Sequence, residues 1–180
     1  MKFQTVVFTA FAAGLLTACT HSTPSAVSAS QESPLSDQAR QVTDDFSVSP
    51  QISIADVKAA AARGVTLIIN NRPDGEMIGQ PTSAEIEAEA TAAGVAYAHI
   101  PIDQRGVSPD HLDAFDKARA GADDGKTLAF CRSGTRSIIV RSYAAARAGQ
   151  PVAEIIAEAE AAGYDIAGHA PALEALNGGD

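Results

Sequence analysis

The chain has 180 residues, of which 13 are lysine or arginine and 22 are aspartate or glutamate, so its formal net charge is −9 at neutral pH. This acidic balance argues against a nucleic-acid partner, because general nucleic-acid binding neutralises phosphates with lysine and arginine. Aromatic residues make up 5% of the chain and tryptophan is absent, so the core must be mostly aliphatic and alanine-based.

The N-terminus has the pattern of a secretion signal. Lys2 precedes an apolar stretch over residues 6–16, which is too short to span a bilayer and ends in small residues. Residues 16–19, LTAC, resemble a bacterial lipobox, in which the chain is cut before the cysteine and the sulfur is lipidated. The resemblance implies a lipoprotein signal peptide over residues 1–18 and a lipid on Cys19. An ordinary secretion signal with an incidental cysteine is the alternative.

A lipid on Cys19 would anchor the protein to a membrane in the cell envelope, outside the cytoplasm. Thr20 rather than aspartate follows the cysteine, which in lipoproteins suggests the outer membrane if the cell has one. Residues 19–38 are rich in serine, threonine, alanine and proline and have few large apolar side chains, so we expect a flexible tether there. Residues 39–180 have a normal size for one folded domain.

Apolar runs and capping residues alternate regularly after the tether. Continuous apolar runs predict strands covered on both faces, and serine or threonine before a helical pattern predicts an N-cap. Glycine closes nearly every helical pattern. Strands are expected over 46–49 (at the edge of the sheet), 65–69, 95–100 and 126–130, and helices over 53–64, 82–94, 108–121, 136–149, 152–163 and 170–176.

Strands and helices that alternate at short intervals predict an α/β fold. We expect a small, mostly parallel sheet of four to five strands with helices on both faces. Ligands of such sheets bind outside the carboxyl ends of the strands. Three polar loops are expected at those ends, over residues 70–76, 103–106 and 131–136.

The loop at 131–136 has the residues of an anion site that contains a nucleophile. Cys131 follows an apolar strand, Gly134 allows the backbone to bend inward, and a helix begins directly afterwards. Backbone N–H groups and the positive end of that helix would surround the loop and stabilise an anion, including a thiolate. Arg136 can bind two oxygens of an oxyanion at once. Buried packing is the alternative for an isolated cysteine.

The remaining loop residues are candidates for substrate binding. We expect contacts to a bound oxyanion from four further positions around the cysteine, and a hydrogen bond from Ser137 to the leaving thiolate. The four are Arg132, Ser133, Gly134 and Thr135.

The cysteines and histidines of the chain argue against a disulfide and against a metal site. Cys19 and Cys131 are the two cysteines, so a lipid on the first would leave one free thiol and no intramolecular disulfide. The four histidines are scattered without ligand spacing, so we predict no metal site and no cofactor.

Three separated motifs resemble one known family. They are NRPDGE at 71–76, HIP at 99–101 and CRSGTRS at 131–137. In this order they closely resemble the phosphatase-like domain family of beta-lactamase hydrolase-like proteins, over about residues 46–140. The resemblance implies a fold like that of the dual-specificity cysteine phosphatases, with Cys131 as nucleophile and Arg136 as oxyanion clamp.

The cysteine loop departs from the pattern of those phosphatases. Their loop has histidine before the cysteine and two residues between the glycine and the arginine, whereas here Phe130 precedes Cys131 and only Thr135 separates Gly134 from Arg136. This shorter loop also looks like the active loop of rhodanese-type sulfurtransferases, in which the cysteine carries a persulfide. Three functions therefore stay open: phosphate monoester hydrolysis, sulfur transfer, and non-enzymatic binding of an anion or of a phosphate- or sulfur-carrying partner.

A phosphatase also needs a general acid that protonates the leaving group. Asp103 lies 28 residues before Cys131, a placement similar to that of the acid in cysteine phosphatases, and Asp74 is the other candidate. Ordinary turn formation is the alternative role of each aspartate. Arg72 is a further candidate for contact with the substrate anion.

Overall fold

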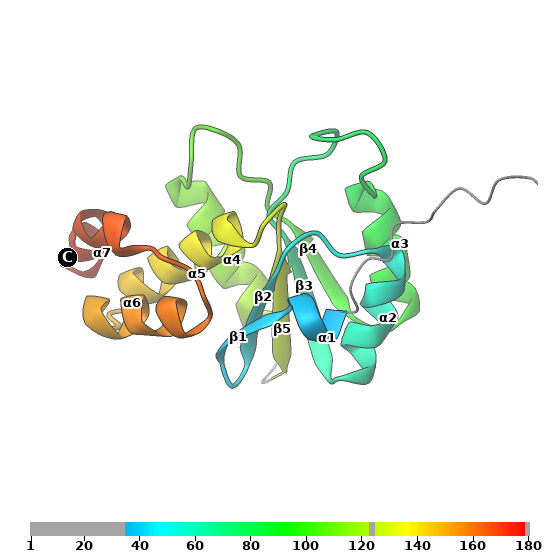
Figure 1. Cartoon of the computed structure of the whole chain (residues 1–180), viewed down its shortest axis with the longest axis horizontal. Helices are drawn as coiled ribbons and strands as arrows, with labels where there is room; N and C mark the ends of the chain where they lie inside the picture. The colour runs from blue at the N-terminus through cyan, green and yellow to red at the C-terminus, as the bar shows by residue number, and fades with distance from the viewer. Residues whose placement is uncertain (1–34, 123–124, 179–180) are drawn as a thin grey trace, which may run out of the picture. The chain divides into compact units, whose positions relative to one another are not determined.

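Five strands form one mixed sheet in the order β1-β2-β5-β3-β4 (Figure 1). The computed structural model describes residues 35–122 and 125–178. Strand β1 (Arg40–Thr43) runs antiparallel to β2 (Phe46–Ser49). The other pairs are parallel and join β2, β5 (Lys126–Phe130), β3 (Val65–Asn70) and β4 (Ala96–His99). The expected small, mostly parallel sheet is therefore confirmed.

The register of the sheet places the ends of the parallel strands level with one another. Asn70 pairs with Phe130 on one side and with His99 on the other, and Ser49 also pairs with Phe130. The next residues of these strands therefore leave the sheet at the same edge, where Figure 1 shows the loops after β3, β4 and β5. The three polar loops expected at the carboxyl ends of the strands meet there.

Helices cover both faces of the sheet, as expected. On one face, α2 (Ile54–Ala62) and α3 (Ser83–Ala92) pack on a core that includes Ile68 and Leu128. On the other face, α4 (Pro109–Ala120) and α5 (Thr135–Arg147) pack on a core that includes Ile69 and Ala129. Neighbouring residues of one strand point to opposite faces, so these continuous apolar strands supply both cores.

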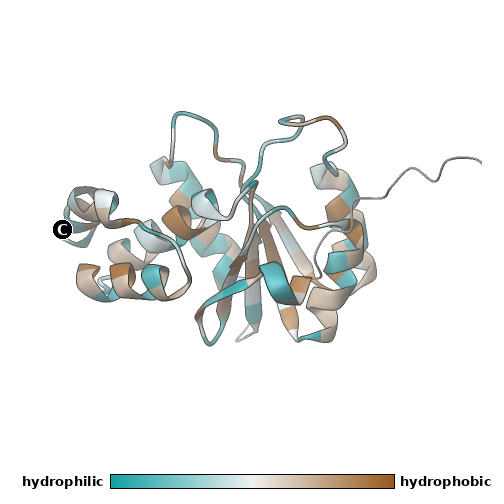
Figure 2. Cartoon of the chain, viewed as in Figure 1, coloured by the Kyte–Doolittle hydropathy of each residue, from teal (hydrophilic) through white to brown (hydrophobic). Residues whose placement is uncertain are grey.

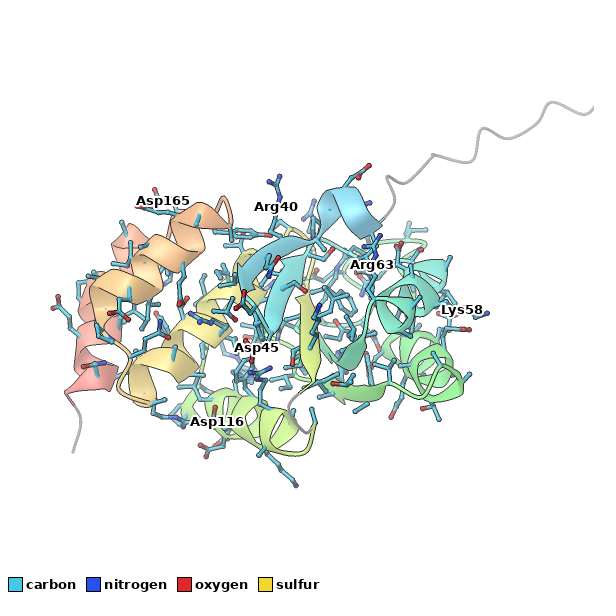
Figure 3. All side chains as sticks on the ribbon, turned by 90° about the horizontal axis from the view of Figure 1, so that it is seen from below. Arg40, Asp45, Lys58, Arg63, Asp116 and Asp165 are labelled. Atoms are coloured by element: carbon cyan, nitrogen blue, oxygen red, sulfur yellow. The ribbon has the colours of Figure 1, made fainter. Side chains whose placement is uncertain are left out.

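The end of the chain adds a second layer of helices next to α5. This layer comprises α6 (Val152–Ala161), the short 3-10 helix η1 (Ala167–His169) and α7 (Ala170–Asn177). Hydrophobic residues gather on the strands between the helices (Figure 2), while charged side chains such as Lys58, Asp116 and Asp165 point outward (Figure 3).

The expected helix starts at Ser53, Thr82 and Ser108 are confirmed. Each side chain accepts a hydrogen bond from the backbone N–H three residues later, and the side chain at that later position bonds back to the cap. Two of these capping boxes use an acidic residue, and His111 takes this place in α4. These caps satisfy backbone N–H groups that a helix leaves unpaired at its start.

Two boundaries of the domain differ from the sequence-based expectation. Strand β2, expected at the edge of the sheet, lies between β1 and β5, and β1 is the edge strand. The sequence of β1 gives a weak apolar signal, because Val42 is its one buried residue. The structure also places Leu35 in a helical turn, α1 (Leu35–Gln38), and buries it in the core with Val57. Residues 35–38, expected to belong to the tether, therefore form a helical turn that is part of the domain, and residues 19–34 lie outside the described residues.

The signal peptide predicted over residues 1–18 and the lipidation site predicted at Cys19 lie outside the described residues. Within residues 35–122 and 125–178, no helix is long and apolar enough to cross a membrane.

Candidate active site

The loop between β5 and α5 wraps around the sulfur of Cys131. The side chain of Cys131 is fully buried, and the backbone N–H of Gly134 donates a hydrogen bond to its sulfur at 3.1 Å. Gly134 is also the N-cap residue of α5, so the sulfur lies at the positive end of a 13-residue helix. An N–H donor and a helix N-terminus both stabilise the anionic form of a thiol relative to the neutral form.

Only glycine fits at position 134. Its φ angle is +90°, in the left-handed region that favours glycine. A Cβ atom there would also lie 2.0 Å from the hydroxyl oxygen of Tyr164. Tyr164, which follows α6, packs against the loop and donates a hydrogen bond to the backbone oxygen of Ser133 at 3.4 Å. Burial raises the pKa of Tyr164, and its proximity to Cys131 adds to that shift.

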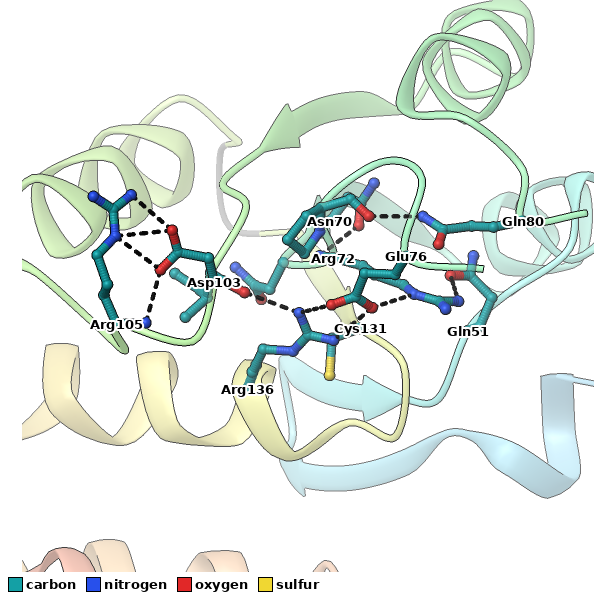
Figure 4. A network of polar contacts seen from close by, with 12 residues as sticks. Gln51, Asn70, Arg72, Glu76, Gln80, Asp103, Arg105, Cys131 and Arg136 are labelled. Atoms are coloured by element: carbon teal, nitrogen blue, oxygen red, sulfur yellow. Dashed lines mark hydrogen bonds and ion pairs between the residues drawn. The ribbon is translucent and has the colours of Figure 1, made fainter. Parts of the chain in front are cut away.

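A single carboxylate, that of Glu76, holds Arg136 in place (Figure 4). Arg136 Nη1 donates to Glu76 Oε1 at 2.7 Å, and Arg136 Nη2 donates to Glu76 Oε2 at 2.9 Å. Arg136 Nη1 also donates to the backbone oxygen of Ile102 at 2.9 Å. These contacts join the three loops, because Glu76 follows β3, Ile102 follows β4 and Arg136 follows β5.

The hydrogen bonds to Glu76 and Ile102 determine which edge of the Arg136 guanidinium is left for an anion. A guanidinium has five N–H donors, and three of them are used here by Glu76 and Ile102. The remaining two, on Nε and Nη2, lie on one edge of the group and match the spacing of two oxyanion oxygens. The hydrogen bonds to Glu76 raise the pKa of Arg136, and the nearby Cys131 adds to that shift.

A second arginine, Arg72, also binds the carboxylate of Glu76. Arg72 is buried, and its Nε donates to Glu76 Oε2 at 2.8 Å while its Nη1 donates to the side-chain oxygen of Gln51 at 2.7 Å. Its Nη2 has no hydrogen-bond partner among the described residues. Arg72 therefore positions Glu76 in this structure rather than presenting its charge at the surface.

Two arginines around one carboxylate leave the site with an excess of positive charge. The hydrogen bonds from Arg136 and, next, from Arg72 lower the pKa of Glu76 from 4.5 to about 2, so the carboxylate is ionised at neutral pH. The three groups together carry one net positive charge, which an oxyanion or a thiolate can neutralise.

Buried amides fix the loop that supplies Glu76. The side chain of Asn71 donates to the backbone oxygen of Ile100 at 3.0 Å, and the side chain of Asn70 accepts from the backbone N–H of Arg72 at 2.9 Å. A ring nitrogen of His99 bonds the backbone oxygen of Arg72 at 2.9 Å. The motifs at 71–76 and 99–101 thus serve to position Glu76 and Arg72.

Neither candidate general acid contacts Cys131 in this state. The carboxylate of Asp103 is paired with Arg105, whose Nη2 lies 2.7 Å from it, and the hydrogen bonds from Arg105 lower the pKa of Asp103. Asp74 accepts a hydrogen bond from the backbone N–H of Ser83 at 2.8 Å and so holds the start of α3. Both aspartates lie on loops that contact Arg136, Asp74 through Glu76 and Asp103 through Ile102.

The other predicted substrate contacts divide into exposed and buried groups. Arg132, Ser133 and Thr135 are exposed, and the two hydroxyls of Ser133 and Thr135 share a hydrogen bond at 3.0 Å. Ser137 is buried, and its hydroxyl has no hydrogen-bond partner among the described residues. The hydrogen bond predicted from Ser137 to the sulfur of Cys131 is therefore not formed in this structure.

Sequence reasoning gave no role to Glu76, Tyr164 or Gln51, which support the site. Glu76 stands in a recognised motif, but nothing in its spacing from Arg136 indicates the contact, since 60 residues separate them. Tyr164 follows a helix-closing glycine without any motif around it. Within the described ranges, no group of three or more histidine, cysteine or acidic side chains could hold a metal ion.

The fold and the loop define the class of protein. A parallel-sheet α/β domain with a cysteine and an arginine on the loop from a central strand to a helix is a phosphatase-like domain. The family model for the phosphatase-like domain of beta-lactamase hydrolase-like proteins matches residues 38–150. The chain belongs to this family, as its three motifs indicated.

Solved structures agree with this assignment. A candidate phosphatase from Neisseria meningitidis is 33% identical, with 76% of this chain and 96% of that chain covered and a TM-score of 0.67. The structure of Tk-PTP in its active form is 19% identical, with 79% of this chain and 98% of that chain covered and a TM-score of 0.60. The similarity to Tk-PTP, at 19% identity, concerns the fold alone.

Curated relatives are longer than this chain. The beta-lactamase hydrolase-like protein of Agrobacterium fabrum is 35% identical over 101 residues, which are 56% of this chain and 23% of the relative. The protein of the same name from Xylella fastidiosa is 35% identical over 107 residues, 59% of this chain and 25% of the relative. The chain thus spans about a quarter of the length of these relatives.

Gly134→Ala should destabilise the protein and disrupt the loop for two reasons. The added Cβ would clash with the hydroxyl of Tyr164, and alanine would be strained at the positive φ of this position. Gly149→Ala is the matched control, since Gly149 has a φ of +87° but no neighbouring atom lies within 4 Å of the place that a Cβ would take. The control should lose about 1–2 kcal/mol from backbone strain alone. Urea unfolding of both variants measures the difference, and equal losses would contradict the steric role of Tyr164.

Glu76→Gln should remove a contribution to stability that depends on pH. Because the folded state lowers the pKa of Glu76 from 4.5 to about 2, this contribution is complete above pH 4.5 and is lost as the pH falls toward 2. The difference in the free energy of unfolding between the wild type and the variant should therefore narrow over that range. Glu174→Gln, in the exposed part of α7, serves as control. A difference that stays constant from pH 7 to pH 2.5 would be inconsistent with the ion pairs described.

Proposed function

We propose that the domain hydrolyses a phosphate monoester through a covalent intermediate on Cys131. The observation that carries this proposal is the arrangement of Arg136, whose contacts to Glu76 and Ile102 leave its Nε and Nη2 donors for an oxyanion next to the sulfur. The membership of a phosphatase-like family supports the same reaction class.

In the first step, the thiolate of Cys131 attacks phosphorus and an S–P bond forms while the P–O bond to the leaving group breaks. The electron pair of that bond goes to the leaving oxygen, which takes a proton from a general acid. Arg136 and the N–H groups at the start of α5 stabilise the charge on the other phosphoryl oxygens, because first-turn N–H groups have no partner within the helix.

In the second step, water attacks phosphorus and the S–P bond breaks, which returns the electron pair to the sulfur and releases inorganic phosphate. The group that gave up its proton in the first step takes one from the attacking water. We assign this role to Asp103, because it lines the same cavity as Arg136, whereas Asp74 is engaged at the start of α3. To act, Asp103 must leave the exposed pair with Arg105, which side-chain motion can break at little cost.

Cys131→Ser should reduce the release of phosphate from an aryl phosphate by about a thousandfold or more, because the thiolate is the nucleophile. The same variant should still bind inorganic phosphate, since Arg136 and the loop N–H groups remain. Phosphate release measures the first effect and calorimetry the second. Turnover retained by the serine variant would rule out the covalent mechanism.

Arg105→Ala should move the alkaline limb of the pH–rate profile to higher pH. The hydrogen bonds from Arg105 lower the pKa of Asp103, so without them the aspartate keeps its proton at higher pH and remains an effective acid there. Arg63→Ala, an exposed arginine that closes α2, is the control and should leave the limb in place. An unchanged limb in Arg105→Ala, together with full activity of Asp103→Asn, would exclude Asp103 as the acid.

The length of the loop favours a second candidate function. Four residues separate Cys131 from Arg136, one fewer than in the cysteine phosphatases that the sequence resembles, and the shorter loop is similar to that of rhodanese-type sulfurtransferases. In that reaction the thiolate of Cys131 would attack the outer sulfur of a thiosulfate-like donor, the S–S bond of the donor would break and sulfite would leave. The acceptor would then attack the outer sulfur of the persulfide and return the thiolate. Formation of thiocyanate from thiosulfate and cyanide, without release of phosphate from esters, would favour sulfur transfer. Anion binding without either turnover would favour a binding module.

The lipid on Cys19 and the location in the cell envelope stay proposals that rest on the sequence of the first 19 residues. Together with the phosphatase proposal, they suggest a small anionic substrate outside the cytoplasm.

A further inference from the structure

A cavity of about 280 Å³ lies beside Arg136 and is also lined by Asp103 and Arg105. Figure 4 shows these two residues on the opposite side of Arg136 from Arg72. The loop after β4, helix α5 and the residue at the end of η1 line the cavity. Its lining includes Arg136 and Asp103 together with Ile102, Val107, Ile139, Tyr143 and His169. Cys131 is not among the lining residues, so the cavity adjoins the anion site through Arg136.

The positions of Arg136 and Asp103 identify what such a cavity would hold. Arg136 is the group that binds the phosphoryl oxygens, and Asp103 is the group proposed to protonate the leaving oxygen. A general acid must come within hydrogen-bond distance of that oxygen. A leaving group that reaches from Arg136 to the Asp103 loop would therefore extend into the cavity that both residues line.

The walls of the cavity change in character with distance from Arg136. Ile102, Val107 and Ile139 supply aliphatic surface along its length. Positions 136, 139 and 143 of α5 lie on one face of the helix, so Tyr143 marks the end of the cavity two turns away from Arg136. There, the hydroxyl of Tyr143 and Nδ1 of His169 share a hydrogen bond at 2.8 Å.

This pair leaves the second ring nitrogen of His169, Nε2, for a ligand. The hydroxyl of Tyr143 can donate to Nδ1 or accept from it, and the tautomer of His169 decides which. A ligand acceptor at Nε2 selects the tautomer in which Nε2 carries the hydrogen and Tyr143 donates to Nδ1. No hydrogen-bond partner of Nε2 is found among the described residues.

We propose that the cavity is the leaving-group subsite of the domain. It would take phosphate monoesters whose leaving group has an apolar body the size of a ring and an acceptor, such as a carboxylate, at its far end, where His169 binds it. The volume agrees with such a body, because a cavity of about 150 Å³ holds benzene. This inference rests on the proposed phosphatase function.

The test measures binding to Cys131→Ser protein, so that turnover does not interfere. Calorimetry compares inorganic phosphate, phenyl phosphate and 4-carboxyphenyl phosphate. We expect the carboxylated ester to bind about tenfold more tightly than phenyl phosphate, the factor that one charge-assisted hydrogen bond provides. Adding His169→Ala should abolish this difference and leave the affinity for inorganic phosphate unchanged.

A second variant tests whether the apolar part of the cavity contributes to ester binding. Ile139→Trp should fill the cavity and weaken both esters but not inorganic phosphate, whereas Ile156→Trp, on α6 and outside the cavity lining, should weaken neither. Thermal melting establishes that each variant is folded.

The outcomes separate the two proposals. Equal binding of the two esters, or discrimination that survives His169→Ala but is lost in Arg105→Ala, would overturn the assignment of the far end to His169. Ester binding that Ile139→Trp leaves unchanged would overturn the subsite itself while the phosphatase proposal stands. If no phosphate compound binds at all, the anion site fails and the subsite with it.

Discussion

The site depends on the carboxylate of Glu76, which two arginines share. Without it, Arg72 and Arg136 would face each other as like charges, one of them buried. With it, both guanidinium groups have a fixed place, and the one next to Cys131 presents a defined edge to an anion. The cost of burying these charges is offset by the hydrogen bonds that connect them, because a buried ion pair is stable only when its geometry is complete.

The parallel sheet is what brings this network together. Strand β5 lies between β2 and β3, and the carboxyl ends of β3, β4 and β5 are level. The three loops that follow these strands carry Glu76, Ile102 and Arg136. The carboxylate of Glu76 and the backbone oxygen of Ile102 both accept hydrogen bonds from the guanidinium of Arg136. A binding site at this edge is the usual consequence of parallel topology.

The surroundings of the Cys131 sulfur also fix its position. Gly134 adopts a conformation that few other residues tolerate, its N–H points at the sulfur, and Tyr164 packs where a side chain would otherwise be. Because Tyr164 comes from the segment after α6, the C-terminal helices contribute to the loop even though the family model ends at residue 150. The same segment continues to His169, which reaches the cavity on the other side of α5.

Local patterns in the sequence were sufficient for most elements of the fold and for choosing the loop after β5 as the candidate site. Continuous apolar runs identified the parallel strands, the caps at Ser53, Thr82 and Ser108 placed three helix starts, and the residues around Cys131 indicated an anion site. Strand β1 escaped detection because one buried residue, Val42, makes no pattern.

Long-range contacts decided the rest. The sequence could name Arg136 as a clamp, but only the folded chain shows which of its donors are free, because Glu76 and Ile102 approach it from loops 60 and 34 residues away. Tyr164 and His169 reach the site through the packing of the C-terminal helices against α5, which no local pattern encodes.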